Sequence, residues 1–238
     1  EYFLGNAEPA VVVCSPKNHE WVKKVANKCG TKHVLTLGDD RSGTLLEKAG
    51  KLSDKFKTVK RADDDLAAIL YTSGTTGRSK GAMLTHKNLG SNAKVLQKFW
   101  AWKKGDVLLH ALPIFHVHGL FVASHGALLN GSKMIWLPRL DTKELIKHMP
   151  RSTVMMGVPT FYVRLLLDKD FNKQTVRNMR LFISGSAPLL TETFNLFKER
   201  TGHTILERYG MSETVMLVSN PYQGARVGGS VGLPLPQT

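Results

Sequence analysis

Short apolar runs alternate along the chain with segments whose apolar residues recur at the spacing of a helix. The runs predict strands, because they are short and rich in apolar and β-branched residues. They occupy residues 10–14, 33–37, 66–71, 107–112, 133–137, 153–157, 180–184 and 204–208.

Helical patterns lie between these runs. The first surrounds residues 21–26 and stops before Gly30, and Thr85 is predicted to cap another helix that ends near Phe99. Further helical patterns cover 142–149, 160–167 and 190–200. Regular alternation of strands and helices predicts an α/β fold with layered, largely parallel sheets flanked by helices.

A polar segment, residues 40–65, interrupts the pattern and ends in Arg-Ala-Asp-Asp-Asp. It predicts a boundary between a partial α/β subdomain, residues 1–65, and a second subdomain, residues 66–238; the alternative is a helix and a surface loop within one domain. The length of 238 residues suits either arrangement. The turn-rich residues 228–236 have no closing element after them, so we expect the second subdomain to be truncated at its C-terminal end.

Composition narrows the class of protein. A hydrophobic content of 42% and a charged content of 22% are typical of folded, soluble domains, and no apolar stretch reaches the roughly 18 residues of a membrane span. The first residues do not resemble a secretory signal. Cys14 and Cys29 are too far apart for a CxxC site, so we expect a reducing compartment, by default the cytoplasm, with the mitochondrial matrix as the alternative.

The formal net charge is +14, and it raises the question of an anionic partner. The basic residues are scattered and are not interleaved with aromatic residues, which disfavours nucleic-acid binding. A positive field of this size favours the capture of small polyanions.

The most informative segment is the glycine-rich stretch 71–81, Tyr-Thr-Ser-Gly-Thr-Thr-Gly-Arg-Ser-Lys-Gly, which follows a strand expected to be buried. Glycines let backbone N–H groups converge on an anion, while hydroxyls and two cations add donors and charge. The stretch therefore predicts a phosphate-binding loop, against the alternative of a hydrophilic surface loop. It is not a P-loop, because Lys80 is followed by Gly81 and not by Ser or Thr.

This stretch resembles the phosphate-binding motif of the adenylate-forming superfamily, which includes acyl-CoA synthetases, adenylation domains of peptide synthetases and luciferases. Other segments resemble motifs of that superfamily in the same order: the aromatic-His acyl-site motif at 113–119, the adenine segment at 184–189, the Tyr-Gly-x-Ser/Thr-Glu motif within 207–214 and the Gly-x-Pro motif within 231–236. The resemblance covers residues 66–238 strongly and the first 65 residues weakly. It implies the N-terminal domain of such an enzyme.

Within the superfamily, longer runs resemble malonyl-CoA synthetases. They are residues 112–123, 156–162, 179–189 and 202–211. The resemblance implies ATP-dependent ligation of malonate to coenzyme A through malonyl-adenylate, with Mg²⁺ as cofactor and small molecules as partners. The alternatives are ligation of another acid, medium-chain fatty or aryl, and a non-catalytic nucleotide-binding fragment.

The resemblance assigns roles to residues of the nucleotide site. It implies that the β- and γ-phosphates of ATP contact Thr72, Ser73, Gly74, Thr75, Thr76, Gly77 and Lys80. It implies that the nucleotide pocket is lined by Gly185, Ser186, Ala187, Pro188, Tyr209, Gly210 and Met211, with Glu207 and Arg208 at its flank. Thr214 is expected at the α-phosphate.

Catalytic roles are expected for Thr76, for Glu213, which would bind Mg²⁺, and for His116, between the acyl and thiol sites. A packed histidine is the alternative for His116. A metal site with His118 is a further alternative, but no cysteine or carboxylate nearby completes a tetrahedral ligand set.

The second carboxylate of malonate requires a cation or several donors if it is buried. Candidate partners are Arg164 and Arg180, with Ser186 as a further donor. Val117 and Met211 are expected to form the wall of the acid pocket.

The superfamily continues beyond the Gly-x-Pro motif with an Asp that holds the ribose hydroxyls and a small C-terminal domain that carries a catalytic Lys. Neither is found in this sequence, which ends at Thr238. We therefore expect the chain by itself to have little or no ligase activity, while it retains weak binding of ATP phosphates.

Overall fold

The computed structural model describes residues 1–73 and 77–236, which belong to two compact units. The first unit is Glu1–Arg61 and the second begins at Ala62. The division lies inside the predicted polar segment, four residues before the expected boundary. That segment also contains a helix, α3 (Thr44–Ala49), which the sequence analysis offered only as an alternative.

The first unit holds a small parallel sheet. Its strands are β1 (Val11–Cys14) and β2 (His33–Thr36), paired in register from Val11 opposite His33. Its other elements are α1 (Tyr2–Ala7), the 3₁₀ turn Pro16–Asn18 and α2 (His19–Lys28). Helix α2 contacts both strands and buries Val22 and Ala26, the apolar positions that predicted it.

The second unit is built around a seven-stranded sheet with the order β11-β10-β9-β8-β7-β5-β6. The pairs from β6 to β9 are parallel, and β10 and β11 are antiparallel additions at one side. The strands are β5 (Val107–His110), β6 (Lys133–Trp136), β7 (Val154–Gly157), β8 (Leu181–Ser184), β9 (Leu206–Tyr209), β10 (Val218–Ser219) and β11 (Leu233–Pro234).

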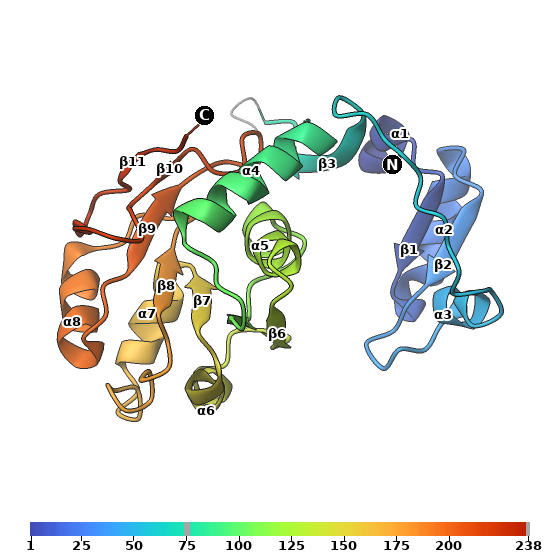
Figure 1. Cartoon of the computed structure of the whole chain (residues 1–238). Coiled ribbons are helices and arrows are strands. Elements are labelled where there is room, and N and C mark those ends of the chain that lie inside the picture. Colours follow the sequence, from blue (N-terminus) through green and yellow to red (C-terminus); the bar gives the residue numbers. More distant parts are fainter. Residues whose placement is uncertain (74–76, 237–238) are drawn as a thin grey trace. The chain divides into compact units, whose positions relative to one another are not determined.

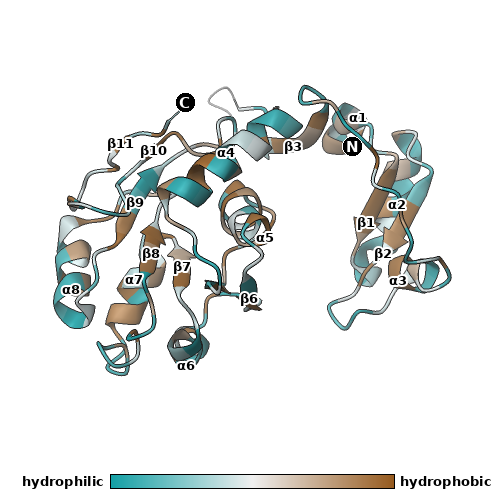
Figure 2. Ribbon diagram, viewed as in Figure 1, coloured by the Kyte–Doolittle hydropathy of each residue, from teal (hydrophilic) through white to brown (hydrophobic). Residues whose placement is uncertain are grey.

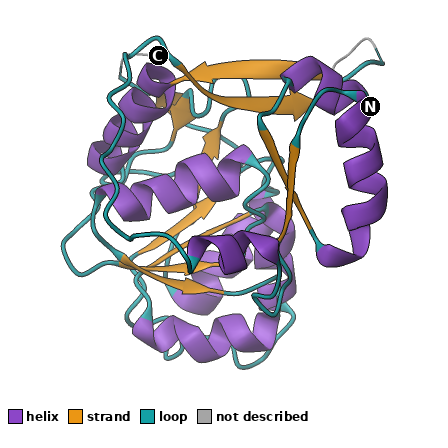
Figure 3. Cartoon of the chain, turned by 90° about the vertical axis from the view of Figure 1, so that its right-hand side faces the viewer, coloured by secondary structure: helices purple, strands orange, loops and turns teal. Residues whose placement is uncertain are grey.

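Helices flank this sheet in two groups, as Figures 1 and 3 show. In one group α4 contacts α5, and in the other α7 contacts α6 and α8. The helices are α4 (His86–Phe99), α5 (His125–Leu129), α6 (Thr142–His148), α7 (Pro159–Leu166) and α8 (Thr191–Thr201), with a π-helical turn at His118–Ser124 and a 3₁₀ turn at Met149–Arg151. The layered, largely parallel α/β fold predicted from the sequence is confirmed.

The core lies at the centre of the sheet. Every residue of β7 and β8 is buried, and β8 is largely brown, that is apolar, in Figure 2. Phe182 of β8 packs edge-on against Phe197 of α8 with ring centroids 5.0 Å apart. Burial on both faces explains why these strands read as continuous apolar runs.

Strand β3 (Leu66–Thr72) does not belong to this sheet. It pairs with β4 (Lys80–Thr85) in a separate antiparallel hairpin, from Leu66 opposite Thr85 to Thr72 opposite Lys80. The expectation of a buried strand before the glycine-rich loop is therefore wrong, since no residue of β3 is fully buried. The apolar run predicted a strand but gave no information about which sheet would receive it.

Thr85 ends this hairpin and caps α4, as predicted. Its Oγ1 accepts a hydrogen bond from the Asn88 amide N–H at 3.2 Å, and the Asn88 Oδ1 accepts one from the Thr85 amide N–H at 2.9 Å. This reciprocal pair is a capping box, in which two otherwise unsatisfied amides find partners.

None of the helices in the described ranges, 1–73 and 77–236, is both long and apolar enough to cross a membrane.

Candidate functional site

The chain reverses its direction of progress across the sheet between β5 and β7. From β5 it moves outward to β6, and then it returns to the other side of β5 to form β7, β8 and β9 in turn. In open α/β sheets, ligands bind beyond the carboxyl ends of the strands at such a switch point. We call the edge where β5, β7, β8 and β9 end the carboxyl edge, and the opposite edge the amino edge.

The segments that leave the carboxyl edge carry the motifs identified in the sequence. His118, which follows β5, is 2% exposed, and its Nδ1 lies 3.2 Å from the Oγ of Ser186, which follows β8. Ser186 has a left-handed backbone with φ of 69°, a strained conformation for a residue other than glycine. The fold thus brings together side chains from two motifs that are 68 residues apart.

The histidines of this edge are held neutral. Burial, reinforced by the nearby Arg208 charge, lowers the pKa of His118 well below its ordinary value, and the same two causes lower the pKa of the more exposed His116. The Nδ1 of His116 accepts a hydrogen bond from the His118 amide at 3.2 Å. A neutral imidazole that accepts at Nδ1 carries its proton at Nε2, so His116 is a hydrogen-bond donor.

Arg208 of β9 is the unusual member of the site. It is 2% exposed, and its Nε and Nη2 have no hydrogen-bond partner among residues 1–73 and 77–236. Burial lowers the pKa of Arg208 to about 10, so its guanidinium is still charged at neutral pH. A buried charge without a partner costs free energy, and an anion that reached these donors would recover it.

Gly185 leaves the space that this guanidinium occupies. A Cβ at position 185 would lie 2.5 Å from the Arg208 Cζ, so only glycine fits directly after β8. The neighbouring Glu207 points elsewhere: its Oε1 accepts a hydrogen bond from the Leu189 amide at 2.9 Å. Glu207 therefore holds the turn that contains Ala187 and Pro188, while its Oε2 is buried without a hydrogen-bond partner in the described residues.

The loop of residues 210–217, between β9 and β10, carries Glu213 and Thr214. Together with Asn88, Ser91 and Asn92 of α4 they line a cavity of about 160 Å³. Tyr209, at the end of β9, and Met211 are both exposed, which leaves the Tyr209 ring free to stack against a planar group. Val117, expected in the wall of the acid pocket, is buried in the core.

The glycine-rich stretch connects the paired ends of the β3–β4 hairpin. Thr72 and Lys80 face each other across the last register position, and Ser73, Gly77 and Lys80 are exposed. Gly74, Thr75 and Thr76, which the sequence analysis assigned to the phosphates and to catalysis, lie outside the described residues.

No group of three or more His, Cys, Asp or Glu side chains in the described parts of the chain is arranged to hold a metal ion. Magnesium does not require such a cage, because it is commonly bound by one or two carboxylates together with phosphate oxygens of the substrate. The single carboxylate of Glu213, beside the Thr214 hydroxyl in one cavity, fits that mode of binding.

Comparison with known proteins decides the family. The sequence pattern described as AMP-binding enzyme matches residues 1–238, the whole chain.

The chain belongs to the AMP-binding enzyme family.

Similar members of the AMP-binding family include malonate–CoA ligases. The mitochondrial malonate–CoA ligase of Mus musculus is 45% identical over 252 residues, covering 99% of this chain and 42% of that protein. The malonate–CoA ligase of Arabidopsis thaliana is 33% identical over 256 residues, with the same coverage of 99% and 42%. The ATP-bound crystal structure of MatB from Rhodopseudomonas palustris is 54% identical, has a TM-score of 0.96, and covers 99% of this chain and 46% of that one. The chain thus spans less than half the length of these relatives.

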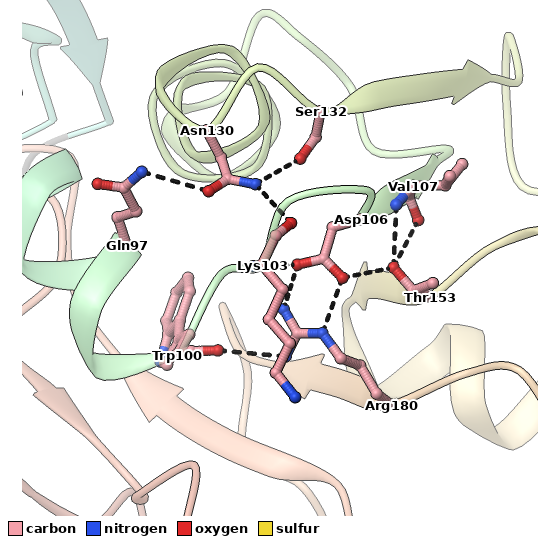
Figure 4. Close-up of polar contacts among 9 residues, drawn as sticks. All are labelled: Gln97, Trp100, Lys103, Asp106, Val107, Asn130, Ser132, Thr153 and Arg180. Atoms are coloured by element: carbon pink, nitrogen blue, oxygen red, sulfur yellow. Dashed lines mark hydrogen bonds and ion pairs between the residues drawn. The ribbon is translucent and has the colours of Figure 1, made fainter.

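The structure separates Arg180 from the carboxyl edge. Arg180 lies directly before β8, at the amino edge, where its Nε donates to the Asp106 Oδ1 at 2.8 Å and its Nη2 pairs with Oδ2 (Figure 4). Its side chain also points to the Trp100 carbonyl and lies over the Tyr222 ring. A guanidinium committed in this way at the opposite edge is not available to a substrate carboxylate, so the expected role of Arg180 is wrong.

Arg164 is also placed away from this site. It is exposed in the last turn of α7, where it lines a surface cavity of about 710 Å³ together with Arg139 and Asp168. None of the residues at the carboxyl edge lines that cavity. Of the arginines considered from the sequence, Arg208 is the one whose surroundings suit an incoming anion.

Asn92 was not identified from the sequence. It occupies a buried position on α4, in the same stripe as Leu89, Ala93 and Leu96. A polar residue within an apolar helical stripe was the available signal, because burial of an amide requires hydrogen-bond partners.

Proposed function

We propose that this chain is the nucleotide- and acid-binding part of a ligase that joins malonate to coenzyme A. In the first step a malonate carboxylate oxygen attacks the α-phosphorus of ATP, which forms malonyl-adenylate and releases pyrophosphate. In the second step the coenzyme A sulfur attacks the acyl carbonyl, which releases AMP and forms malonyl-CoA. The names of the similar proteins and the chemistry of the carboxyl edge support this reaction.

The observation that carries the proposal is the unpaired, charged guanidinium of Arg208 beneath Gly185. Malonate differs from simple fatty acids by a second carboxylate, which remains charged while the first reacts. Arg208 offers two free donors for that group, and an arginine fork matches the geometry of a carboxylate. The His118–Ser186 pair lies beside the guanidinium and adds a hydroxyl donor.

The nucleotide is assigned to the segments around this acid pocket. Thr72, Ser73, Gly77 and Lys80, with the rest of the glycine-rich stretch, hold the β- and γ-phosphates through backbone and side-chain donors. Tyr209 stacks against the adenine, and Thr214 donates to the α-phosphate. Magnesium, bound through Glu213 and phosphate oxygens, supplies neutralisation of the charge on the phosphates.

His116 acts at the reacting acyl group. Its neutral ring, with the proton on Nε2, donates a hydrogen bond to an oxygen whose negative charge grows during the reaction. A neutral donor suits both steps, because a charged imidazolium at this position would bind the malonate carboxylate and the adenylate phosphate too tightly for transfer.

Titration of the chain with acids of equal size tests the assignment. In the presence of Mg·ATP we expect malonate to bind at least about tenfold more tightly than butyrate, because one hydrogen bond to a charged group contributes roughly 1.5–3 kcal/mol. The substitution Arg208→Met should remove this difference, whereas Arg177→Met, which removes an exposed arginine, should preserve it.

Pyrophosphate–ATP isotope exchange provides the catalytic counterpart; because the chain by itself is expected to have little or no activity, the quantity compared is the dependence of any residual exchange on the acid. Exchange that depends on malonate and not on butyrate supports the proposal. Equal binding of malonate and butyrate, or an unchanged preference in Arg208→Met, would favour a ligase for another acid.

A further inference from the structure

Helix α4 joins the two loops that the proposed function assigns to the nucleotide. It begins at His86, directly after β4, whose first residue is Lys80 of the glycine-rich stretch. In its middle, the Nδ2 of Asn92 donates to the carbonyl of Met216 at 2.8 Å. This buried hydrogen bond connects residues 124 positions apart, from a side chain of α4 to the backbone of the 210–217 loop.

The 210–217 loop holds a strained backbone at the residue before that carbonyl. Val215 has φ of +60°, and a β-branched side chain in the left-handed region is a conformational outlier. The turn is tight, since a Cβ on Gly210 would lie 1.9 Å from the Val215 carbonyl oxygen. Strain of this kind persists only where surrounding contacts hold the backbone in place.

Three hydrogen bonds from the neighbouring structure hold this loop, one of which joins the Leu235 amide to the Leu217 carbonyl at 2.8 Å. The Asn92 amide fixes the Met216 carbonyl, and the Leu217 amide donates to the Tyr209 carbonyl at 3.1 Å, which closes the loop on β9. Beyond the loop, the Trp100 Nε1 at the end of α4 donates to the Ser219 Oγ at 3.0 Å. Of these, only Asn92 acts next to the strained residue.

Two residues that line the cavity beside α4 carry buried, unsatisfied polar atoms. The Oδ1 of Asn92 and the Oγ1 of Thr214 are both buried and lack a hydrogen-bond partner in the described part of the chain. Both residues line the 160 Å³ cavity with Glu213. Buried polar atoms are nearly always paired in a finished structure, so this cavity is prepared for a polar ligand.

We propose that Asn92 is a positioning residue for the nucleotide: its amide holds the Met216 carbonyl, keeps Val215 in the left-handed conformation, and thereby directs Glu213 and Thr214 into the cavity beside α4. The identity of the ligand rests on the proposed function. The effect of Asn92 on the conformation of the 210–217 loop does not depend on that function. Loss of the amide lets Val215 relax, and the loop then no longer presents both side chains at once.

The substitution Asn92→Leu removes the donor while keeping the branching and the number of side-chain heavy atoms, and Asn92→Ser provides a smaller second variant. We expect backbone amides of residues 211–217 to exchange with deuterium at least about tenfold faster in both variants, while exchange elsewhere in α4 changes little. Binding of Mg·ATP, measured by calorimetry on the whole chain, should weaken by about tenfold. Gln97→Leu is the matched control, since it removes a side-chain amide of the same helix that bonds to Asn130, away from the loop.

A double variant separates positioning from general stability. Glycine adopts positive φ without strain, so Val215→Gly in the Asn92→Leu background should restore at least part of the Mg·ATP affinity. If Asn92 merely stabilises the fold, the loss of the buried Val215 side chain would weaken the double variant further, and that result would overturn the inference. Unchanged deuterium exchange at 211–217 in both Asn92 variants would overturn it as well.

Failure of the proposed function gives a different result. The unsubstituted chain would then not bind Mg·ATP, while deuterium exchange would still report whether Asn92 holds the 210–217 loop.

Discussion

Two arginines at opposite edges of the same sheet show how differently one protein treats a buried cation. Arg180, at the amino edge, has its guanidinium paired with Asp106 and directed at a backbone carbonyl. Arg208, at the carboxyl edge, is buried even more completely, yet two of its nitrogens have no partner in the described residues. The comparison teaches that a buried guanidinium can be paired where it joins segments of the fold and left with unsatisfied donors where an anion is proposed to bind.

At the amino edge, the Asp106 carboxylate is the acceptor that pairs with Arg180 and with neighbouring donors. Its carboxylate accepts hydrogen bonds from the Lys103 amide at 2.7 Å, the Thr153 hydroxyl at 2.8 Å and Arg180, as Figure 4 shows. Although burial alone would raise it, the pKa of Asp106 is lowered by these hydrogen bonds and by the Arg180 charge. The charged form of Asp106 is therefore part of the folded structure.

The largest effect is expected from breaking the satisfied pair. Asp106→Ala leaves the half-buried Arg180 charge without its counter-ion and the Lys103 amide without its acceptor, so we expect the free energy of unfolding to fall by about 3–5 kcal/mol. Urea denaturation at pH 7 measures it. As a control, Asp170→Ala removes a partner of the exposed Lys143 and should barely change the midpoint.

The unsatisfied arginine should respond in the opposite direction. Arg208→Met removes a buried, uncompensated charge, so we expect the free energy of unfolding to rise by about 1–3 kcal/mol, in line with the lowering of the Arg208 pKa to about 10. The same denaturation experiment measures it. A clear loss of stability would mean that Arg208 serves the fold, as Arg180 does, and the contrast between the two edges would disappear.

As the pH falls, the free energy of unfolding should decrease first because of His118, which lies at the carboxyl edge. The pKa of His118 is lowered in the folded state, so below about pH 6.5 the unfolded chain binds more protons and stability falls with pH, by up to about 1.4 kcal/mol per pH unit for one proton. The lowered pKa of Asp106 works differently, since its contribution is complete above about pH 4 and is lost only as the pH falls further.

Denaturation at pH 7 and at pH 5 measures the contribution of His118 to the pH dependence of stability. His110, His125 and His203 also have a pKa lowered by burial, so the informative quantity is the difference between the unsubstituted chain and His118→Gln. We expect the variant to lose less stability between the two pH values. Equal losses would contradict a buried, neutral His118.

The smallest effect is expected at an ion pair outside both edges. Lys143 lies 3.0 Å from an Asp168 oxygen and 3.5 Å from an Asp170 oxygen, and its side chain is exposed. Water and salt screen such pairs, so Lys143→Met should leave the denaturation midpoint nearly unchanged, and any difference should vanish in 1 M salt. A large effect of Lys143→Met would mean that an exposed ion pair stabilises the fold as much as the Asp106–Arg180 pair at the amino edge.

Several elements were predictable because their signals are local. Thr85 and Asn88 form the cap expected from Thr85 at the start of a helical pattern, and the wholly buried β7 and β8 are continuous apolar runs. The β4 strand and the π-helical turn His118–Ser124 were missed. The former is a short strand rich in small residues that depends on its partner β3, and the latter shares its apolar pattern with an ordinary helix or strand.

The candidate site was predictable to the extent that it resides in contiguous motifs. The segments that contain His116, Ser186 and Tyr209 leave the same edge of the sheet, where the strand order brings their elements together. The arginine assignment was not predictable. Arg180 and Arg208 both sit in or beside short apolar runs, and nothing within several residues of either distinguishes a paired cation from an unpaired one.

The sequence by itself determined the alternation of strands and helices, the cap of α4 and the glycine-rich stretch, because each depends on residues within a few positions of one another. Only the tertiary structure decided that β3 and β4 form their own sheet, that Asp106 meets Arg180 across 74 residues, and that Arg208 meets no anion in the described chain. The physical reason is that periodicity specifies which face of an element is apolar, whereas the partner of a buried charge is set by strand order and register, which depend on the packing of the whole sheet.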